Sequence, residues 1–279
     1  MFLIQKRREL NPTVTLIEVK APHIAKKALP GQFIILRVDE DGERIPLTVA
    51  DCNVEEGTVT VIFQIVGATT EQLNHVPEGG YIQDFVGPLG VPSHLEGLKK
   101  VAVIGGGVGC AIAYPIAKGL HKQGTEVHSI VGFRNRDLVI LEEEFQAVSD
   151  LMKIMTDDGS YGEKGLVTDA LKALIESGEQ YDEVIAIGPL VMMKFVAKLT
   201  KEYGIKTTVS MNPIMVDGTG MCGGCRLTVG GEVKFACVDG PDFDGHQVDF
   251  DEAIQRSRMY FGKERHAHEE TCNLFKGVK

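Results

Sequence analysis

Three cysteines lie close together in the segment VDGTGMCGGCRLTVGGEVKFAC (216–237). Thiolates at the spacing of Cys222, Cys225 and Cys237 are typical ligands of zinc or of an iron–sulfur cluster, and both sites normally take four protein ligands. Five positions before Cys222 stands Asp217, which completes the plant-type [2Fe–2S] spacing with aspartate in the first position. Because a carboxylate can also bind iron, the spacing predicts these four residues as cluster ligands.

Other chemistries fit the same residues. Three cysteines and Asp217 could form a zinc site, and His246 could complete it, since structural zinc prefers Cys and His. A CxxC redox dithiol normally opens a helix of a βαβ unit, which this segment does not, and inert thiols are the remaining alternative. His266 and His268 are expected to belong to a polar tail. The other cysteines have no partner at ligand spacing and are expected to be buried thiols: Cys52, Cys110 and Cys272.

A glycine-rich stretch, VAVIGGGVGCA (101–111), ends an apolar strand and opens a helix. Glycines let a pyrophosphate approach the backbone, and a helix N-terminus offers free N–H groups. The full GxGxxG spacing is absent, so a turn that serves only packing is the alternative. The next strand ends in Arg134, Asn135 and Arg136 rather than in an acidic residue, so ribose recognition must use other groups. The predicted nucleotide contacts are Gly105, Gly106, Gly107, Val108 and Gly109.

A second glycine site follows the fourth strand of the same region, in IGPLVMMK (187–194). Ligands bind at the carboxyl ends of parallel strands, so Gly188, Pro189 and Met192 are predicted cofactor contacts, with a turn and core methionines as the alternative. The loop TDDGSYGEKG (156–165) lies at the same edge, either as part of the site or as a solvated connection.

The predicted secondary structure that positions these residues differs before and after Lys99. β-branched and aromatic runs broken by Gly, Pro, Asn and Asp predict an antiparallel barrel or sandwich before Lys99, with one short helix at 69–76. From Lys99 to about Met211, strands and helices alternate, which predicts a parallel sheet with helices on both faces. The predicted domains are a β-barrel (1–98), an α/β domain (99–211), a cluster segment (212–248), and a helix with a tail (249–279).

The composition narrows the class of protein. The chain has 279 residues, 43% of them hydrophobic and 24% charged, with a net charge of −10. Without a long basic run, nucleic acid and anionic membranes are disfavoured partners. No apolar run reaches the roughly 20 residues of a membrane helix, and the N-terminus does not read as a signal peptide. We therefore expect a cytoplasmic protein, in which cysteines stay reduced.

A β-rich domain, a nucleotide-binding α/β domain and a C-terminal [2Fe–2S] segment, in this order, resemble the ferredoxin–NADP reductase superfamily over nearly the whole chain. Within it, the sequence is similar to electron-transfer subunits of dihydroorotate dehydrogenase B. It resembles more closely the small (alpha) subunits of NADH-dependent reduced ferredoxin:NADP oxidoreductases, the electron-bifurcating transhydrogenases, a group that includes sulfide dehydrogenase beta subunits. The aspartate in place of the first cluster cysteine and DGPDF (239–243) carry this narrower resemblance.

The resemblance implies FAD in the first domain. ERIPLTV (43–49) stands where the superfamily has an Arg-x-x-Ser/Thr strand, with Thr48 at the hydroxyl that faces the flavin, although Arg44 lies one residue further back than usual. VGATTEQL (66–73) matches the segment near the FAD pyrophosphate, and GPLG (87–90) closes the flavin domain. The implied FAD-binding residues are Arg44, Pro46, Leu47, Thr48, Gly67, Thr70, Gly87 and Gly90.

The resemblance also implies the activity. NAD(H) on the glycine loop would exchange hydride with FAD, and a [2Fe–2S] cluster would relay single electrons. The acceptor would be a larger flavin and [4Fe–4S] subunit, bound as a heterodimer, that handles NADP(H) and ferredoxin. No catalytic acid–base pair is expected, because the cofactors carry the chemistry. Two alternatives are a dihydroorotate dehydrogenase partner, which Asp217 argues against, and a zinc-stabilised nucleotide-binding protein without redox turnover.

Overall fold

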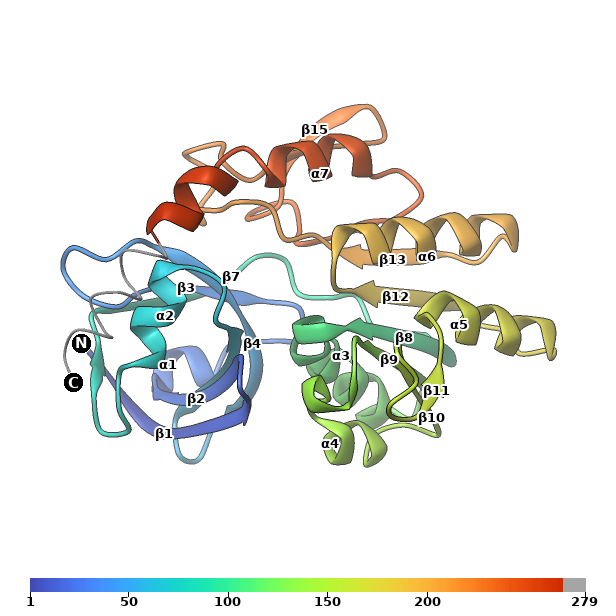
Figure 1. The fold of residues 1–279 in the computed structure, drawn as a ribbon, viewed down its shortest axis with the longest axis horizontal. Coiled ribbons are helices and arrows are strands. Elements are labelled where there is room, and N and C mark those ends of the chain that lie inside the picture. Colours follow the sequence, from blue (N-terminus) through green and yellow to red (C-terminus); the bar gives the residue numbers. More distant parts are fainter. Residues whose placement is uncertain (268–279) are drawn as a thin grey trace.

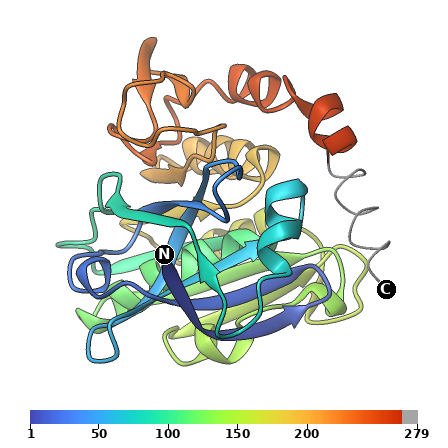
Figure 2. The same cartoon turned by 90° about the vertical axis from the view of Figure 1, so that its left-hand side faces the viewer.

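The computed structural model describes residues 1–267, which form a β-barrel, a parallel sheet with helices and a small cysteine-bearing segment (Figure 1). The barrel and the sheet lie side by side. The cysteine-bearing segment and α7 (Phe250–Ser257) lie together on one side of both (Figures 1 and 2). The predicted fold class is confirmed.

The barrel is a seven-stranded antiparallel sheet with the spatial order β6-β1-β2-β5-β4-β3-β7. Its strands are rich in β-branched residues, which pack well on a pleated, half-buried surface. Phe63, Ile17 and Ile34 lie buried inside it. Its elements are β1 (Phe2–Asn11), β2 (Val14–Lys20), α1 (Pro22–Ala25), β3 (Phe33–Arg37), β4 (Ile45–Asn53), β5 (Thr58–Gln64), α2 (Ala68–Asn74), β6 (Tyr81–Ile82) and β7 (Asp84–Leu89).

The second sheet has the order β11-β10-β9-β8-β12-β13-β16, and all its pairs are parallel except the last. The chain order reverses direction between β8 and β12, a point where open α/β sheets bind ligands. Its elements before residue 211 are β8 (Lys100–Gly106), α3 (Cys110–Lys122), β9 (Glu126–Phe133), α4 (Glu142–Gln146), β10 (Leu151–Thr156), β11 (Glu163–Lys164), α5 (Val167–Glu176), β12 (Glu183–Ile187), α6 (Leu190–Glu202) and β13 (Thr207–Ser210).

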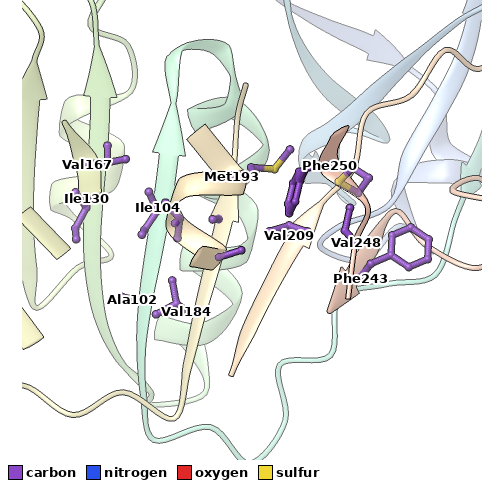
Figure 3. Packing of buried hydrophobic residues seen from close by; sticks show 14 of the residues in the cluster. Ala102, Ile104, Ile130, Val167, Val184, Met193, Val209, Phe243, Val248 and Phe250 are labelled. Atoms are coloured by element: carbon purple, nitrogen blue, oxygen red, sulfur yellow. The ribbon is translucent and has the colours of Figure 1, made fainter. Parts of the chain in front are cut away.

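Helices cover both faces of this sheet, because successive strand residues point to opposite sides. Val101 and Val103 pack with α3 and α4, whereas Ala102 and Ile104 pack with α5 and α6. The second layer extends into the cysteine-bearing segment, where Figure 3 shows Phe243, Val248 and Phe250 beside Val209 and Met193. The segment and the sheet therefore share one hydrophobic core.

The cysteine-bearing segment leaves the sheet after β13 and returns to it. It contains a hairpin of β14 (Arg226–Val229) and β15 (Glu232–Phe235). It then forms β16 (Asp242–Asp244), which pairs antiparallel with β13 so that Ser210 lies opposite Asp242. Both ends of the loop are thus held at one edge of the sheet.

Asp242 occupies the junction of all three parts. Ser93, from the connection between barrel and sheet, donates a hydrogen bond to its Oδ2. Its Oδ1 is shielded from solvent and has no hydrogen-bond partner in the part of the chain that is described. Burial raises the pKa of Asp242 above its ordinary value; the hydroxyls of Ser93 and Ser210 oppose this shift. The folded state therefore disfavours the charged carboxylate more than the unfolded chain does.

A raised carboxyl pKa in the folded state gives stability that is full below the unfolded pKa and is lost as pH rises through the folded pKa. We therefore expect Asp242→Asn to gain stability relative to the parent protein as pH rises from 4 to 8. A gain in Tm of roughly 2–4 °C at pH 8 corresponds to about 1 kcal/mol. Thermal melts across this range measure it. Asp244→Asn, at an exposed residue of the same strand, is the control, and equal profiles for both variants would contradict the assignment.

Candidate functional site

A cavity of about 880 Å³ opens at the carboxyl edge of the parallel sheet, between the sheet and the barrel. Asn11, Thr13, Val14 and Gln64 line it from the barrel, and Gly106 to Gly109 line it from the sheet. Its size lies within the range of sites for cofactors. A bound dinucleotide would therefore reach from the glycine loop toward the flavin domain.

The glycine loop serves two purposes. A side chain on Gly109 would meet the carbonyl oxygen of Ile187 at 2.5 Å, so this glycine lets the loop pack against the end of β12. Gly107 has φ +54°, and a side chain there would meet nothing within 4 Å. That open space belongs to the cavity. Packing therefore accounts for Gly109, whereas Gly107 leaves room for a ligand.

The second predicted glycine site faces the same cavity. Gly188, Pro189 and Met192 line it, because β12 lies beside β8 in the sheet. A side chain on Gly188 would come within 3.1 Å of the Gly106 backbone. The two sites that lie far apart in the sequence thus form one edge.

Two side chains that line the cavity are candidates for binding the ribose. Arg134 and Asp157 both line the cavity. Arg136 lies with its guanidinium 5.4 Å from the ring centre of Tyr161, and its backbone N–H bonds to Ser160. Asp157 directly follows β10, which ends at Thr156, so a carboxylate just beyond the carboxyl end of a strand is the signal available in the sequence.

The residues predicted to bind FAD lie on one rim of the barrel. Thr48 of β4 pairs with Phe33 of β3, and Phe33 pairs with Leu89 of β7, within GPLG (87–90). Thr69 at the N-terminus of α2 donates a hydrogen bond to Glu43, the neighbour of Arg44, at 3.2 Å. Three separate stretches are thereby brought together: Arg44, Pro46, Leu47 and Thr48; Gly67 and Thr70; and Gly87 and Gly90.

Thr70 of α2 forms hydrogen bonds with the backbone at the N-terminus of its own helix. The hydroxyl of Thr70 accepts hydrogen bonds from the backbone N–H groups of Val66 and Gly67, each at 3.0 Å. It donates to the carbonyl of Gly67 at 2.9 Å. Thr70 therefore fixes the turn that is predicted to contact the FAD pyrophosphate. Its hydroxyl does not point freely into solvent.

The four predicted cluster ligands form two pairs. Cys225 and Cys237 lie buried at the open end of the hairpin, and their thiols interact with each other. Asp217 lies close enough to Cys222 for its charge to act on that thiol. In a [2Fe–2S] cluster each iron carries bridging sulfides and two protein ligands. Two pairs of ligands therefore fit such a cluster.

The surroundings of Cys222 favour a thiolate. Its sulfur accepts a hydrogen bond from the N–H of Gly224 at 3.4 Å. The backbone N–H groups of Gly224, Asp217 and Val216 hold the pKa of Cys222 below its ordinary value. Burial, together with the Cys225 thiol, raises the pKa of Cys237 to about 11. Within residues 1–267, no three Cys, His, Asp or Glu side chains converge on a single ion.

The carboxylate of Asp217 shapes the loop. Its Oδ2 accepts hydrogen bonds from the N–H and the hydroxyl of Thr219, at 2.8 and 2.5 Å, and from the N–H of Met221 at 3.3 Å. These hydrogen bonds hold the pKa of Asp217 below its ordinary value. Among the described residues, each hydrogen bond to this carboxylate uses Oδ2. Oδ1 therefore accepts no hydrogen bond from the described residues that would compete with its binding to a metal.

The other candidate ligands lie elsewhere. The Nε2 of His246 is 3.1 Å from the hydroxyl of Thr200 on α6. Cys110 is buried in the sheet domain, and Cys52 is half-buried in the barrel. Burial raises the pKa of both thiols, to about 11 for Cys52. Cys272 and His268 lie outside the described residues.

The comparisons with known proteins match this organisation. Residues 212–249 match the iron–sulfur cluster binding domain of dihydroorotate dehydrogenase B, and residues 103–198 match the oxidoreductase NAD-binding domain. A Thermotoga maritima homolog of the dihydroorotate dehydrogenase B (NAD+) electron transfer subunit is 48% identical, over 90% of this chain and 88% of that protein. The chain belongs to this family of electron-transfer subunits.

The chain is also similar to two further proteins. A Clostridium beijerinckii protein described as an uncharacterized protein in the adh 3′ region is 54% identical, over 93% of this chain and 90% of its own length. A solved structure of an NADH-dependent reduced ferredoxin–NADP oxidoreductase, studied for flavin-based electron bifurcation, matches with a TM-score of 0.92. It is 45% identical, and the match covers 97% of each chain.

These matches confirm the predicted class. The protein is an oxidoreductase of the ferredoxin–NADP reductase type and a flavin and iron–sulfur electron-transfer subunit. Its cofactors are FAD, NAD(H) and a [2Fe–2S] cluster. A subunit of this kind implies a larger partner. Within residues 1–267, no helix is both long and apolar enough to span a lipid bilayer.

Proposed function

We propose that this family member exchanges electrons with NAD(H) and delivers them to a larger flavin and [4Fe–4S] subunit that handles NADP(H) and ferredoxin. The observation that carries the proposal is the likeness to the NADH-dependent reduced ferredoxin–NADP oxidoreductase, at 45% identity over 97% of both chains. Asp217 at the first ligand position supports it. A dihydroorotate dehydrogenase partner is the second candidate, favoured by the family match of residues 212–249.

The roles of the residues follow from where they lie. Gly107 leaves the cavity open for the pyrophosphate, and Gly188 and Pro189 bound the end of the cavity near Gly106. Thr48 and its neighbours on β4 would bind the flavin on the barrel. The bound cofactors supply hydride exchange and one-electron transfer, and the chain positions them and excludes water. The domains serve these tasks as barrel (1–98), nucleotide domain (99–211), cluster segment (212–248), and helix with tail (249–279).

The cluster segment also has an exposed surface through which electrons would pass to the partner subunit. Cys222 is exposed, and the neighbouring Met221 has 87% of its surface exposed. Val216 and Val238 add further exposed apolar surface around the same loop. Apolar side chains gathered on a surface commonly mark a protein interface. We place the partner subunit over this loop, because electron transfer to the partner requires a short distance from the cluster.

The proposal is tested first by metal content. We expect about two irons and two sulfides per chain, as a [2Fe–2S] cluster requires, in protein purified without oxygen, together with FAD. One zinc without sulfide would overturn the electron-relay function. Co-purification of the full-length protein with its natural partner then separates the two candidates. A partner carrying [4Fe–4S] clusters supports the proposal, and a dihydroorotate-oxidising partner replaces it with the second candidate.

Asp217→Cys tests the fourth ligand. We expect the variant to keep about two irons per chain but to show a changed EPR spectrum and a lower cluster potential, because thiolate replaces carboxylate and hydrogen bonds to Oδ2 are lost. EPR-monitored redox titration measures both. Asp239→Cys is the matched control, since Asp239 lies in the same segment and bonds to the backbone of Phe235. Unchanged spectra in Asp217→Cys would remove Asp217 from the ligand set.

A further inference from the structure

Arg44 joins the barrel to the cluster loop. Its Nε donates a hydrogen bond to the carbonyl of Val216 at 3.1 Å, and its Nη2 donates to the carbonyl of Asp217 at 3.4 Å. These contacts cross 172 and 173 residues of sequence. Arg44 immediately precedes β4, the strand that contains Thr48. One side chain therefore links the flavin strand to the loop that carries two predicted cluster ligands.

The contact is part of a packed boundary. Gly218, next to Asp217, is buried and lies against Ile35 of β3 and Leu89 of β7. β3 pairs with β4, and β7 pairs with the other edge of β3. The neighbour of Arg44, Glu43, bonds instead to Thr69 of α2. The guanidinium thus faces the cluster loop, while the preceding residue faces the helix whose N-terminus is predicted to meet the FAD pyrophosphate.

The hydrogen bond to Val216 acts on a cluster sulfur through one peptide group. In a trans peptide, the carbonyl and the N–H point in opposite directions. The carbonyl of Val216 points to Arg44, and the N–H of the same peptide belongs to Asp217 and lies close enough to the thiol of Cys222 to lower its pKa. Arg44 therefore fixes the direction of an N–H group that acts on that sulfur.

Two other arginines hold the loop in the same way. Arg256 of α7 donates to the carbonyl of Gly224 at 3.3 Å, and Arg226 donates to the carbonyl of Gly223 at 3.2 Å. Gly224 also donates its N–H to Cys222. Three guanidinium groups thus bind carbonyls of the loop. Arg44 is the one among them that comes from the flavin domain.

We propose that Arg44 is a positioning residue of the electron relay, which orients the Val216–Asp217 peptide toward Cys222 and thereby raises the potential of the cluster. This inference rests on the proposed [2Fe–2S] site. Hydrogen bonds to sulfur and nearby positive charge both favour the form of the cluster that holds one more electron. It differs from the role implied by the superfamily, in which this arginine binds the flavin.

The test is EPR-monitored redox titration of the complete protein with its cofactors. We expect Arg44→Ala to lower the cluster potential, so that at fixed ambient potential the ratio of reduced to oxidised cluster falls about tenfold, or about 59 mV for one electron. The EPR spectrum changes, while FAD content stays at one per chain. Arg44→Lys restores part of the shift, because it returns the charge without the planar fork.

Arg37→Ala is the matched control. Arg37 lies on the neighbouring strand β3 and bonds to Asp84 and to the carbonyl of Glu40, within the barrel. We expect its cluster potential to equal that of the parent protein. If Arg44→Ala fails to retain iron, Arg44→Gln, which keeps a donor but no charge, provides the same titration.

Each result of the titration either supports or overturns the proposed role of Arg44. An unchanged potential and spectrum in the Arg44 variants, with iron retained, overturns the inference but leaves the proposed function standing. Loss of FAD at unchanged potential returns Arg44 to the flavin site and also overturns it. Absence of iron and sulfide in the parent protein defeats the proposed function itself, so the two failures are distinguishable.

Discussion

Replacing Cys222 with alanine is expected to abolish electron delivery from this chain to a one-electron acceptor while leaving the reduction of FAD by NADH in place. Cys222 is exposed, so its loss removes a predicted ligand without opening a cavity in the core. Loss of a group that merely supports metal ligands costs roughly 10–100-fold in affinity or activity, and loss of a ligand exceeds this. We expect a fall of more than about 100-fold in acceptor reduction.

Iron, sulfide and flavin content should be measured beside both rates. Cys52→Ala is the matched control, because Cys52 is a half-buried thiol of the barrel, outside the cluster segment. It should keep its full iron content and both rates. Full iron content in Cys222→Ala would remove this cysteine from the ligand set.

Replacing Gly107 with alanine is expected to raise the KM for NADH by about 10–100-fold. A methyl group there projects into the cavity, where the structure leaves open space beside a backbone with φ +54°. Displacing a phosphate from charged hydrogen bonds costs about 1.5–3 kcal/mol, and each 1.4 kcal/mol is about tenfold in affinity. Steady-state and stopped-flow reduction of the flavin measure the effect.

Gly124→Ala separates ligand exclusion from backbone strain. Gly124 follows α3, has φ +83°, and a side chain there also meets nothing within 4 Å. Both substitutions place alanine at positive φ, which destabilises the fold by roughly 1–2 kcal/mol. We expect similar losses of Tm in the two variants but a normal KM in Gly124→Ala. An equal KM in both would show that the glycine loop serves packing alone.

Much of this architecture was predictable because the signals are local. The alternation of strands and helices from 99 to 211 follows from side-chain periodicity, and the parallel topology then brings Gly188 to Gly106. The cysteine spacing pointed to the cluster segment for the same reason. Each of these signals lies within a few consecutive residues, where backbone geometry leaves a direct trace in the sequence.

Features that depend on distant parts of the chain were not predictable. β16 has only three residues, and its pairing with β13 is set by tertiary packing of Phe243 and Val248. β1 gives a weak local signal, because it contains the charged run Lys6 to Glu9 and its buried residue is Ile4, which precedes that run. The hydrogen bonds of Arg44 and the barrel wall of the cavity have no local pattern, since they join residues far apart in sequence.

The return of the cluster segment to its sheet has a thermodynamic consequence. Because Ser210 pairs with Asp242, the ends of the loop 211–241 are already joined by β13 and β16. The chain entropy lost on closing a loop grows with the logarithm of its length, and here strand pairing, rather than iron, offsets that loss. Assembly of the cluster needs only to order the interior of a loop whose ends are fixed. We therefore expect loss of iron to be a local change, after which the nucleotide sheet keeps its fold.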